Sequence, residues 1–206
     1  SVVTFKHDGP WIVSAVVGPS VELDERNAAL AAPGGFGGPM SATSAAAIVT
    51  VAPNYGADGA GSTTYALSIA DASSGLATAL GDLPITLVTV NATTIEARYN
   101  AGADLAFTVS INPTSGLLTV VQNVALEHGT DGGPGAAHDD SLTLAGKLNA
   151  VVTVMDSDGD TATTPVGIGS VVTFKDDGPS IVSAVVGSSV EVDETNGALA
   201  AAAGAR

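Results

Sequence analysis

Apolar and polar residues alternate along several short stretches of this 206-residue chain, which is the pattern of half-buried β-strands. In residues 106–111 (AFTVSI) the large apolar side chains take every second position, and residues 65–69 (YALSI) repeat this alternation. Residues 171–174 (VVTF) follow it more loosely. Similar segments, rich in Val, Ile and Thr, predict further strands at 12–17, 46–51, 85–90, 93–99, 117–122, 149–155 and 181–186.

Turn-forming residues separate these segments. Residues 112–116 (NPTSG) predict a type I turn that ends with Gly in the left-handed conformation. No window combines a 3.6-residue apolar stripe with helix caps, so no helix is predicted. Residues 33–47 (PGGFGGPMSATSAAA) predict a long surface loop or a segment between modules. Many short strands at roughly even spacing predict an all-β fold, an antiparallel β-sandwich of the immunoglobulin or cadherin kind.

The chain also contains a direct copy of part of itself. Residues 170–201 repeat residues 1–32 at an offset of 169 positions, and the two blocks agree at 26 of 32 positions. One of the six differences places His7 where the second copy has Asp176. A period of this length is too long for a solenoid unit and matches an independently folding domain, so the chain is predicted to come from a tandem-repeat protein.

The repeat sets the predicted module boundaries. Residues 12–177 are expected to form one complete β-sandwich repeat. Residues 1–11 would be the end of the preceding repeat and a junction, and residues 178–206 a second junction with the truncated start of the next repeat. Copying a module is a common way to build length, so this organisation favours an architectural role.

The charge is strongly acidic, with 21 Asp and Glu against 6 Lys and Arg and a formal net charge of −15. This balance excludes nucleic acid as a partner, disfavours anionic membranes and suits cations. There is no Cys, so neither disulfides nor Cys-based zinc sites can form. No apolar stretch is long enough to insert in a membrane, and no signal peptide is visible. Many acids, few aromatics and no Cys suggest an extracellular protein that metal helps to fold.

The sharpest group of acids is Asp156, Asp158 and Asp160, directly after the strand predicted at 149–155. Alternate Asp residues in a tight turn can all face one hard cation, which favours Ca²⁺. The alternative is a solvated Asp-Gly hairpin. The spacing is not that of an EF-hand, because the twelfth position of such a loop would be Gly167.

A second group of acids is duplicated with the repeat. An Asp-Gly-Pro turn follows a predicted strand in both copies, and an acidic segment follows about fourteen residues later. These residues are predicted to bind Ca²⁺ at the module junctions; the alternative is that they only keep a linker soluble. They are Asp8, Asp24 and Glu25 in the first copy and Asp176, Asp177, Asp193 and Glu194 in the second.

Other polar residues give weaker indications. His128 and His138 could bind a transition metal, but the expectation is a plain loop with a structurally satisfied His, and Asp58 is expected to be a turn residue. No nucleophile, zinc-protease or phosphate-loop motif is present, and one Trp with three Tyr offers little for a sugar cleft. The sequence therefore predicts that the protein is not an enzyme.

Motifs spread over most of the 169-residue unit are similar to those of a known family. They are GADG at 56–59, TYALS at 64–68, SGL at 74–76, AFTV at 106–109, TSG at 114–116, VALEH at 124–128, VTVMDSDGDTAT at 152–163 and VTFKDDGP at 172–179. In this order they resemble the tandem extender repeats of giant RTX adhesins, which bacterial type I systems secrete. The DxDGDTAT and F-x-DDGP elements are the most specific.

This resemblance implies a secreted, cell-surface, Ca²⁺-binding β-sandwich module. Many such modules in a row would hold a ligand-binding tip away from the cell. The expected partners are the neighbouring repeats of the same chain and Ca²⁺, and the single module is expected to be monomeric. A ligand-binding adhesin module for a glycan or peptide remains the alternative, and a calcium-dependent hydrolase is a more distant third.

Overall fold

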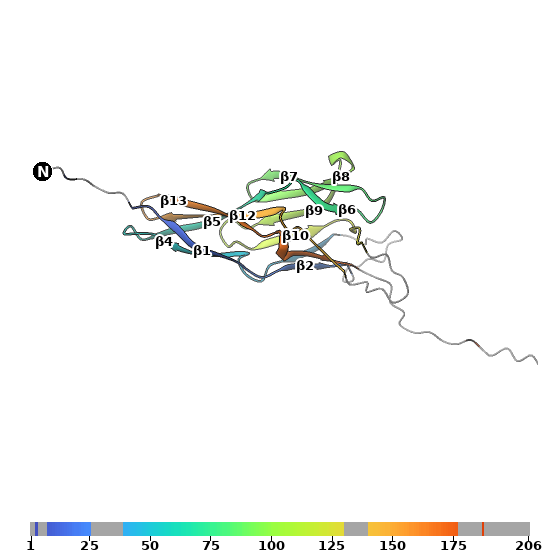
Figure 1. Ribbon diagram of the computed structural model, residues 1–206, viewed down its shortest axis with the longest axis horizontal. Helices are drawn as coiled ribbons and strands as arrows, with labels where there is room; N and C mark the ends of the chain where they lie inside the picture. Colours follow the sequence, from blue (N-terminus) through green and yellow to red (C-terminus); the bar gives the residue numbers. More distant parts are fainter. Residues whose placement is uncertain (1–2, 4–7, 26–38, 130–139, 177–186, 188–206) are drawn as a thin grey trace, which may run out of the picture.

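The protein is all-β. The computed structural model describes residue 3, residues 8–25, 39–129 and 140–176, and residue 187 (Figure 1). Within these ranges the chain forms strands joined by turns and short 3₁₀ segments, and no α-helix is present. The predicted fold class, an all-β protein with antiparallel sheets consistent with a sandwich, is confirmed.

The described strands are short and follow one another closely along the chain. In order they are β1 (Trp11–Val17), β2 (Val21–Asp24), β3 (Met40–Thr43), β4 (Val49–Asn54), β5 (Ala60–Ile69), β6 (Ser73–Ala77), β7 (Pro84–Asn91), β8 (Thr94–Tyr99), β9 (Asp104–Ile111), β10 (Leu118–Gln122), β11 (Ser141–Thr143), β12 (Leu148–Asp156), β13 (Thr161–Gly167) and β14 (Val172–Lys175). The 3₁₀ segments η2 (Asn100–Gly102) and η3 (Gly169–Val171) lie between strands.

The strands form four hydrogen-bonded sheets. The largest has the order β3-β10-β9-β8-β7-β6, and the others are β13-β12-β5, β11-β14-β2 and β1-β4. Figure 1 shows an elongated arrangement, with β1, β4, β5 and β13 towards one end and β2 and β6 towards the other. One pair differs from the antiparallel expectation, because β14 runs parallel to β2.

That parallel pair joins the two copies of the repeated block. Val172 lies opposite Val21 and Lys175 opposite Asp24, so a strand of the second copy is hydrogen-bonded to a strand of the first. β14 also pairs with β11 on its other edge. The strand that begins the second copy is thus an integral part of this module.

The core is formed by the inward-facing residues of these strands. Along β12 every second side chain from Leu148 to Val154 is buried, as the period of a strand requires. Phe107 of β9 and Phe174 of β14 are fully buried, and their ring centroids lie 5.0 Å apart at an interplanar angle of 48°. This tilted contact anchors β14 in the core of the module.

Most of the predicted strands are present in the described residues. β1, β5, β7, β8, β9, β10, β12 and β14 overlap the predicted segments, and the strand expected at 46–51 begins later, at Val49. The segment predicted at 181–186 lies outside the described residues. The turn at residues 112–116 is confirmed: Asn112 Oδ1 accepts the N–H groups of Thr114 (3.0 Å) and Ser115 (2.9 Å), and Gly116 has φ +69°.

The expectation of a surface loop or an inter-module segment over residues 33–47 was wrong at residues 40–43. Residues 40–43 form β3, which pairs with β10, and the Thr43 and Thr119 hydroxyls lie 2.8 Å apart across this pair. Small residues suffice here because β3 is an edge strand with only one neighbour. The strands β2, β6, β11 and β13 were also not expected. β13 contains Pro165, which an edge strand tolerates.

Candidate metal sites

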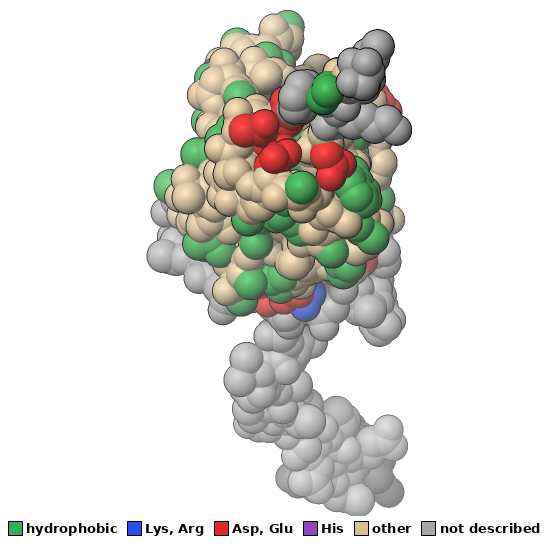
Figure 2. Space-filling model, turned by 90° about the vertical axis from the view of Figure 1, so that its left-hand side faces the viewer, with side chains coloured by type: hydrophobic (Ala, Val, Ile, Leu, Met, Phe, Trp, Pro, Cys, Tyr) green, Lys and Arg blue, Asp and Glu red, His purple; other side chains and the backbone are tan. Residues whose placement is uncertain are grey.

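Acidic side chains gather where the chain enters the module, at the end that Figure 2 faces. We call Asp8, Asp58, Asp156, Asp158 and Asp160 the N-terminal cluster. They come from three segments: the approach to β1, the turn between β4 and β5, and the turn between β12 and β13. Figure 2 shows several acidic side chains grouped on this end face.

Asp156 is the buried member of the N-terminal cluster. It ends β12, and only 1% of it is exposed. Its Oδ1 accepts the N–H groups of Gly159 (3.1 Å) and Asp160 (2.8 Å), which folds the turn around the carboxylate. Its Oδ2 is buried and has no hydrogen-bond partner, an arrangement that proteins seldom leave uncompensated.

A glycine allows β5 to reach this turn. The irregular pairing of β5 with β12 falls at Met155 and Asp156, where the backbone of Gly61 lies against their carbonyl oxygens. A Cβ at Gly61 would clash with both oxygens. The bulge therefore depends on the missing side chain, and it places the β4–β5 turn next to the Asp156 carboxylate.

Asp58 reaches the N-terminal cluster from that turn. The Ser157 hydroxyl donates to the Asp58 carbonyl, and the Ser157 N–H donates to Gly59 O at 3.2 Å. Carboxylate oxygens of Asp58, Asp156 and Asp158 all lie within 4.8 Å of one another. From its sequence, Asp58 is expected to be a plain turn residue, because nothing in a Gly-Ala-Asp-Gly segment indicates a partner about a hundred residues away.

Asp8 and Asp160 lie beside this trio. Asp8 Oδ2 accepts the Ala57 N–H at 3.3 Å, and the carboxylate lies so close to Gly56 (φ +65°) that a Cβ there would be 2.5 Å from Oδ2. A Cβ at Gly9 would lie 3.7 Å from Asp160 Oδ2. The approach to the module and its innermost acidic turn thus lie close together.

The acids of the N-terminal cluster perturb one another. A hydrogen bond with Asp156, burial and the negative charges of Asp156, Asp58 and Asp160 raise the pKa of Asp158. Burial opposes ionisation of Asp156, but hydrogen bonds from Asp158 and from the turn N–H groups outweigh it and lower the pKa of Asp156. The two carboxylates therefore oppose each other's ionisation, and a cation bound between them would relieve that repulsion.

The donors of the N-terminal cluster suit Ca²⁺. All of them are carboxylate or backbone oxygens, the ligands that Ca²⁺ takes, and the buried Oδ2 of Asp156 is an oxygen still lacking a partner. Asp58, Asp156 and Asp158 are the residues that would hold the ion, with Asp8 and Asp160 adjacent.

A second group of polar residues lies at the opposite end of the module. We call Glu25, His128, Asp140 and Asp176 the C-terminal cluster. Glu25 and Asp176 each follow a strand of the parallel pair β2–β14, and Asp140 precedes β11, the other neighbour of β14. The Asp176 N–H donates to Asp140 O at 3.2 Å. Three adjacent strands therefore align three carboxylates along one sheet end.

His128 and Glu25 are the buried members of the C-terminal cluster, 6% and 5% exposed. Glu25 Oε1 accepts Gln122 Nε2 at 2.5 Å and the Leu126 N–H at 3.1 Å. Ligand atoms of Glu25, His128 and Asp176 lie within 4.8 Å of one another. Burial raises the pKa of Glu25, and the negative charge of Asp176 adds to the increase. The two hydrogen bonds and the electrostatic effect of His128 lower the pKa but do not cancel the increase.

The predicted metal residues are therefore divided between the two ends. Asp8, predicted at a junction, lies with Asp156, Asp158 and Asp160, whereas Glu25 lies with Asp176 at the other end. Asp24 is half-buried in β2, opposite Lys175. Asp177, Asp193 and Glu194 lie outside the described residues.

The described Lys and Arg residues are paired away from both clusters. Arg98 binds Glu96 at 2.6 Å, Lys147 binds Asp71 at 2.6 Å and Lys175 binds Glu22 at 2.9 Å. None of these three cations pairs with a member of either cluster. The carboxylates of each cluster lie close together with like charge, which a divalent cation would offset.

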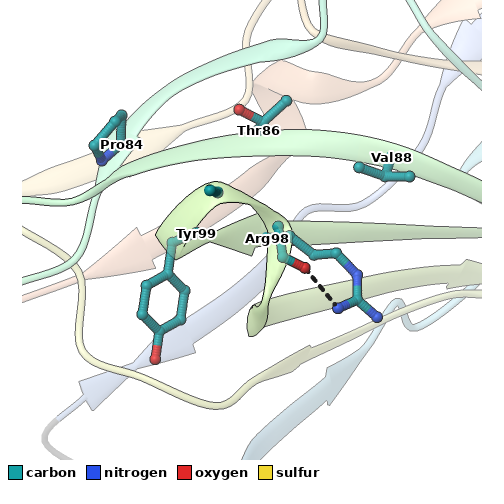
Figure 3. Close-up of a pocket in the computed structure, with 7 residues that line it drawn as sticks. Pro84, Thr86, Val88, Arg98 and Tyr99 are labelled. Atoms are coloured by element: carbon teal, nitrogen blue, oxygen red, sulfur yellow. Dashed lines mark hydrogen bonds between the residues drawn. The ribbon is translucent and has the colours of Figure 1, made fainter.

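A shallow hollow of about 330 Å³ lies on the large sheet, over β7 and the β8–η2 turn (Figure 3). Pro84, Thr86 and Val88 line one side, and Arg98 and Tyr99 the other. The Arg98 guanidinium already binds Glu96 and donates to Gly102 O at 3.2 Å. Tyr99 is the one aromatic residue that lines the hollow and Arg98 is already paired, so the hollow has few groups that could recognise a ligand.

The fold and its end clusters define a β-sandwich module with acidic metal-site candidates at both ends. The chain belongs to the family described as a domain of unknown function (DUF5801), whose model matches residues 20–169. No curated protein and no solved structure matches the chain. No helix in the described residues is long and apolar enough to cross a membrane. The family match excludes β1 and β14, so Asp8 and Asp176 both lie beyond it.

Proposed function

We propose that this chain is a structural extender module of a large secreted bacterial adhesin of the RTX class, stiffened by Ca²⁺ at the N-terminal cluster. The carboxylate trio of Asp58, Asp156 and Asp158 is the observation that supports the metal, because its oxygens converge and Asp156 Oδ2 is buried without a partner. The direct repeat with a period of 169 residues supports the architectural role. Neighbouring repeats of the same chain are the proposed partners.

The position of the N-terminal cluster gives Ca²⁺ a mechanical consequence. Its ligands come from the β4–β5 and β12–β13 turns, and Asp8, in the segment that leads into β1, contacts the first of these turns. An ion held there would tie the incoming chain to the end of the sandwich and fix the direction in which it arrives. Without the ion, the carboxylates repel one another, so folding would be favoured only where Ca²⁺ is plentiful, outside the cell.

The alternative is a ligand-binding adhesin module for a glycan or peptide, and the hollow over β7 is the feature that favours it. Its lining weighs against a sugar site, since Tyr99 is its one aromatic residue and Arg98 is already paired. Titration of the fragment with surface sugars in the presence of Ca²⁺ separates the two functions: saturable binding that is lost in Tyr99→Ala would favour the alternative.

The central experiment is thermal unfolding of the 206-residue chain in Ca²⁺ and in chelator. A ligand present at about 100 times its Kd adds about 2.7 kcal/mol to the free energy of unfolding, so a clear rise in Tm with Ca²⁺ is expected. Asp158→Asn should remove most of this rise, while Asp104→Asn, on a strand outside the cluster, should keep it. An unchanged Tm in chelator would refute the calcium proposal.

A further inference from the structure

The C-terminal cluster contains a buried imidazole with one nitrogen left without a partner. His128 is 6% exposed; Nδ1 lies 3.2 Å from Asp140 Oδ1, whereas Nε2 has no hydrogen-bond partner among the described atoms. A buried ring nitrogen without a partner costs free energy, and such groups in native proteins call for an explanation. Carboxylate oxygens of Glu25 and Asp176 lie within 4.8 Å of its ligand atom, so the ring faces acids.

We propose that Glu25, His128 and Asp176 bind a divalent transition-metal ion of the zinc class at the C-terminal end of the module, with Asp140 orienting the imidazole. The site is separate from the proposed Ca²⁺ site, which lies at the other end of the sandwich.

The neighbours of the ligands are arranged to orient them. His128 Nδ1 lies 3.2 Å from Asp140 Oδ1, which is the contact that a carboxylate makes when it holds a ligating His, so Nε2 is the nitrogen assigned to the metal. Gln122 and the Leu126 N–H both bind Oε1 of Glu25 and fix its carboxylate. Asp140 is thus a positioning residue, and the three ligands come from segments that the fold holds together.

The donor set distinguishes this ion from Ca²⁺. Ca²⁺ takes oxygen ligands, whereas one imidazole nitrogen with two carboxylates is typical of Zn²⁺ and its neighbours. The internal repeat adds a second argument. The residue equivalent to Asp176 in the first copy is His7, so the same position is filled once by a carboxylate and once by an imidazole. Both are ligands for a transition metal, but only the carboxylate is one for Ca²⁺.

The charge of the C-terminal cluster also favours a cation. Glu25, Asp140 and Asp176 bring three carboxylates together, and the nearby Lys175 pairs with Glu22 instead. A divalent ion would offset this repulsion and at the same time satisfy the ring nitrogen. Because metal ligands must be deprotonated, binding should release protons and weaken as pH falls.

The test is titration of the 206-residue chain, saturated with Ca²⁺, with Co²⁺ followed by visible absorption and with Zn²⁺ followed by calorimetry. We expect one additional ion per chain, with the Co²⁺ absorption of a site containing nitrogen. His128→Gln should weaken binding by about tenfold or more, as loss of a ligand or its orienting partner typically does. His7→Gln is the matched control and should bind as the unchanged chain does.

Three further variants keep the test decisive if His128→Gln does not fold. Asp176→His copies the residue of the first repeat and should retain Co²⁺ binding with a changed absorption spectrum, whereas Asp176→Ala should weaken binding. Asp140→Asn should weaken binding by about tenfold and shift the spectrum, because the ring loses its orienting carboxylate. Equal affinity in the unchanged chain, His128→Gln and Asp176→Ala would overturn the proposal, as would the absence of saturable Co²⁺ binding to the Ca²⁺-saturated chain.

This proposal and the calcium proposal fail independently. Asp158→Asn should lose the calcium-dependent rise in Tm and keep Co²⁺ binding, and His128→Gln should show the reverse. A chain that binds Co²⁺ through His128 but shows no response to Ca²⁺ would refute only the extender mechanism.

Discussion

The two ends of the module gather acids in different ways. The N-terminal cluster is formed by turns; Asp8, Asp58 and Asp158 are exposed, and all its donors are oxygens. The C-terminal cluster is formed by the ends of three adjacent strands, buries Glu25 and includes a ring nitrogen. A cluster of acids at each end therefore does not imply the same ion at both. Turns can adjust around a hard cation, whereas strand ends hold a few ligands in fixed positions.

The largest expected effect concerns the strand that leads to the C-terminal cluster. Phe174→Ala should lower the free energy of unfolding by about 3–5 kcal/mol, because a fully buried ring in contact with Phe107 is removed. Chemical denaturation in chelator measures it, with Leu80→Ala, at an 85% exposed residue, as control. A cost below about 1 kcal/mol would show that β14 is not part of this core and that the C-terminal cluster is not assembled as described.

An intermediate effect is expected at the backbone of the N-terminal cluster. Gly61→Ala should lower stability by about 1–3 kcal/mol, because its Cβ would meet the carbonyl oxygens of Met155 and Asp156. The same shift should weaken Ca²⁺ binding and leave Co²⁺ binding at the other end unchanged. Gly167→Ala, where a Cβ would meet only Asn149 Oδ1 at an ordinary contact distance of 3.8 Å, is the matched control. Equal losses of both ions would mean that the two ends are not independent.

A smaller effect, visible as a pH dependence, distinguishes the buried C-terminal cluster. The pKa of Glu25 is raised above its ordinary value of 4.5, mainly by burial. In chelator, its contribution to stability should be complete below pH 4.5 and be lost as pH rises through the raised pKa. Glu25→Gln should therefore be more stable than the unchanged chain at pH 7 and equal to it at pH 4. Denaturation midpoints across this range measure it; a constant difference would contradict the assignment.

The smallest effect provides a baseline from the surface between the ends. A hydrogen bond and ion pair with Lys147 lower the pKa of Asp71 from its ordinary value of 3.8. The contribution of this carboxylate to the free energy of unfolding should therefore be present above pH 3.8 and be lost as pH falls through the lowered pKa. Asp71→Asn should reduce stability only slightly at pH 7, because exposed ion pairs contribute little. The sign is opposite to that of Glu25→Gln. Ca²⁺ and Co²⁺ titrations should be unaffected by Asp71→Asn.

The fold was more predictable from the sequence than the candidate sites were. Alternation identifies strands such as β9 and β12, whose inward faces are large and apolar, because the pattern is local. β3 and β13 are edge strands of small residues and Pro, whose pairing depends on a neighbour rather than on their own sequence. The parallel pairing of β2 with β14 joins residues about 150 positions apart, and no local pattern specifies it.

The same distinction applies to the metal candidates. Asp156, Asp158 and Asp160 are adjacent in sequence and could be recognised as one group. Asp58 could not be assigned to it, because only the pairing of β5 with β12 brings the two turns together. His128 was expected to be a satisfied structural residue. The lack of a partner for its buried Nε2 became visible only once the strand ends beside it were placed.

The parallel pair β2–β14 determines how the module would respond to tension. The chain leads into β2 from the end of the module that holds Asp8, and it leaves β14 at the end that holds Asp176 (Figure 1). Pulling on these two points draws the paired strands past each other along their length. The hydrogen bonds between Val21–Asp24 and Val172–Lys175 are then loaded together in shear, and none can open before the others. A strand pair joined in this way resists extension far better than one peeled apart a bond at a time.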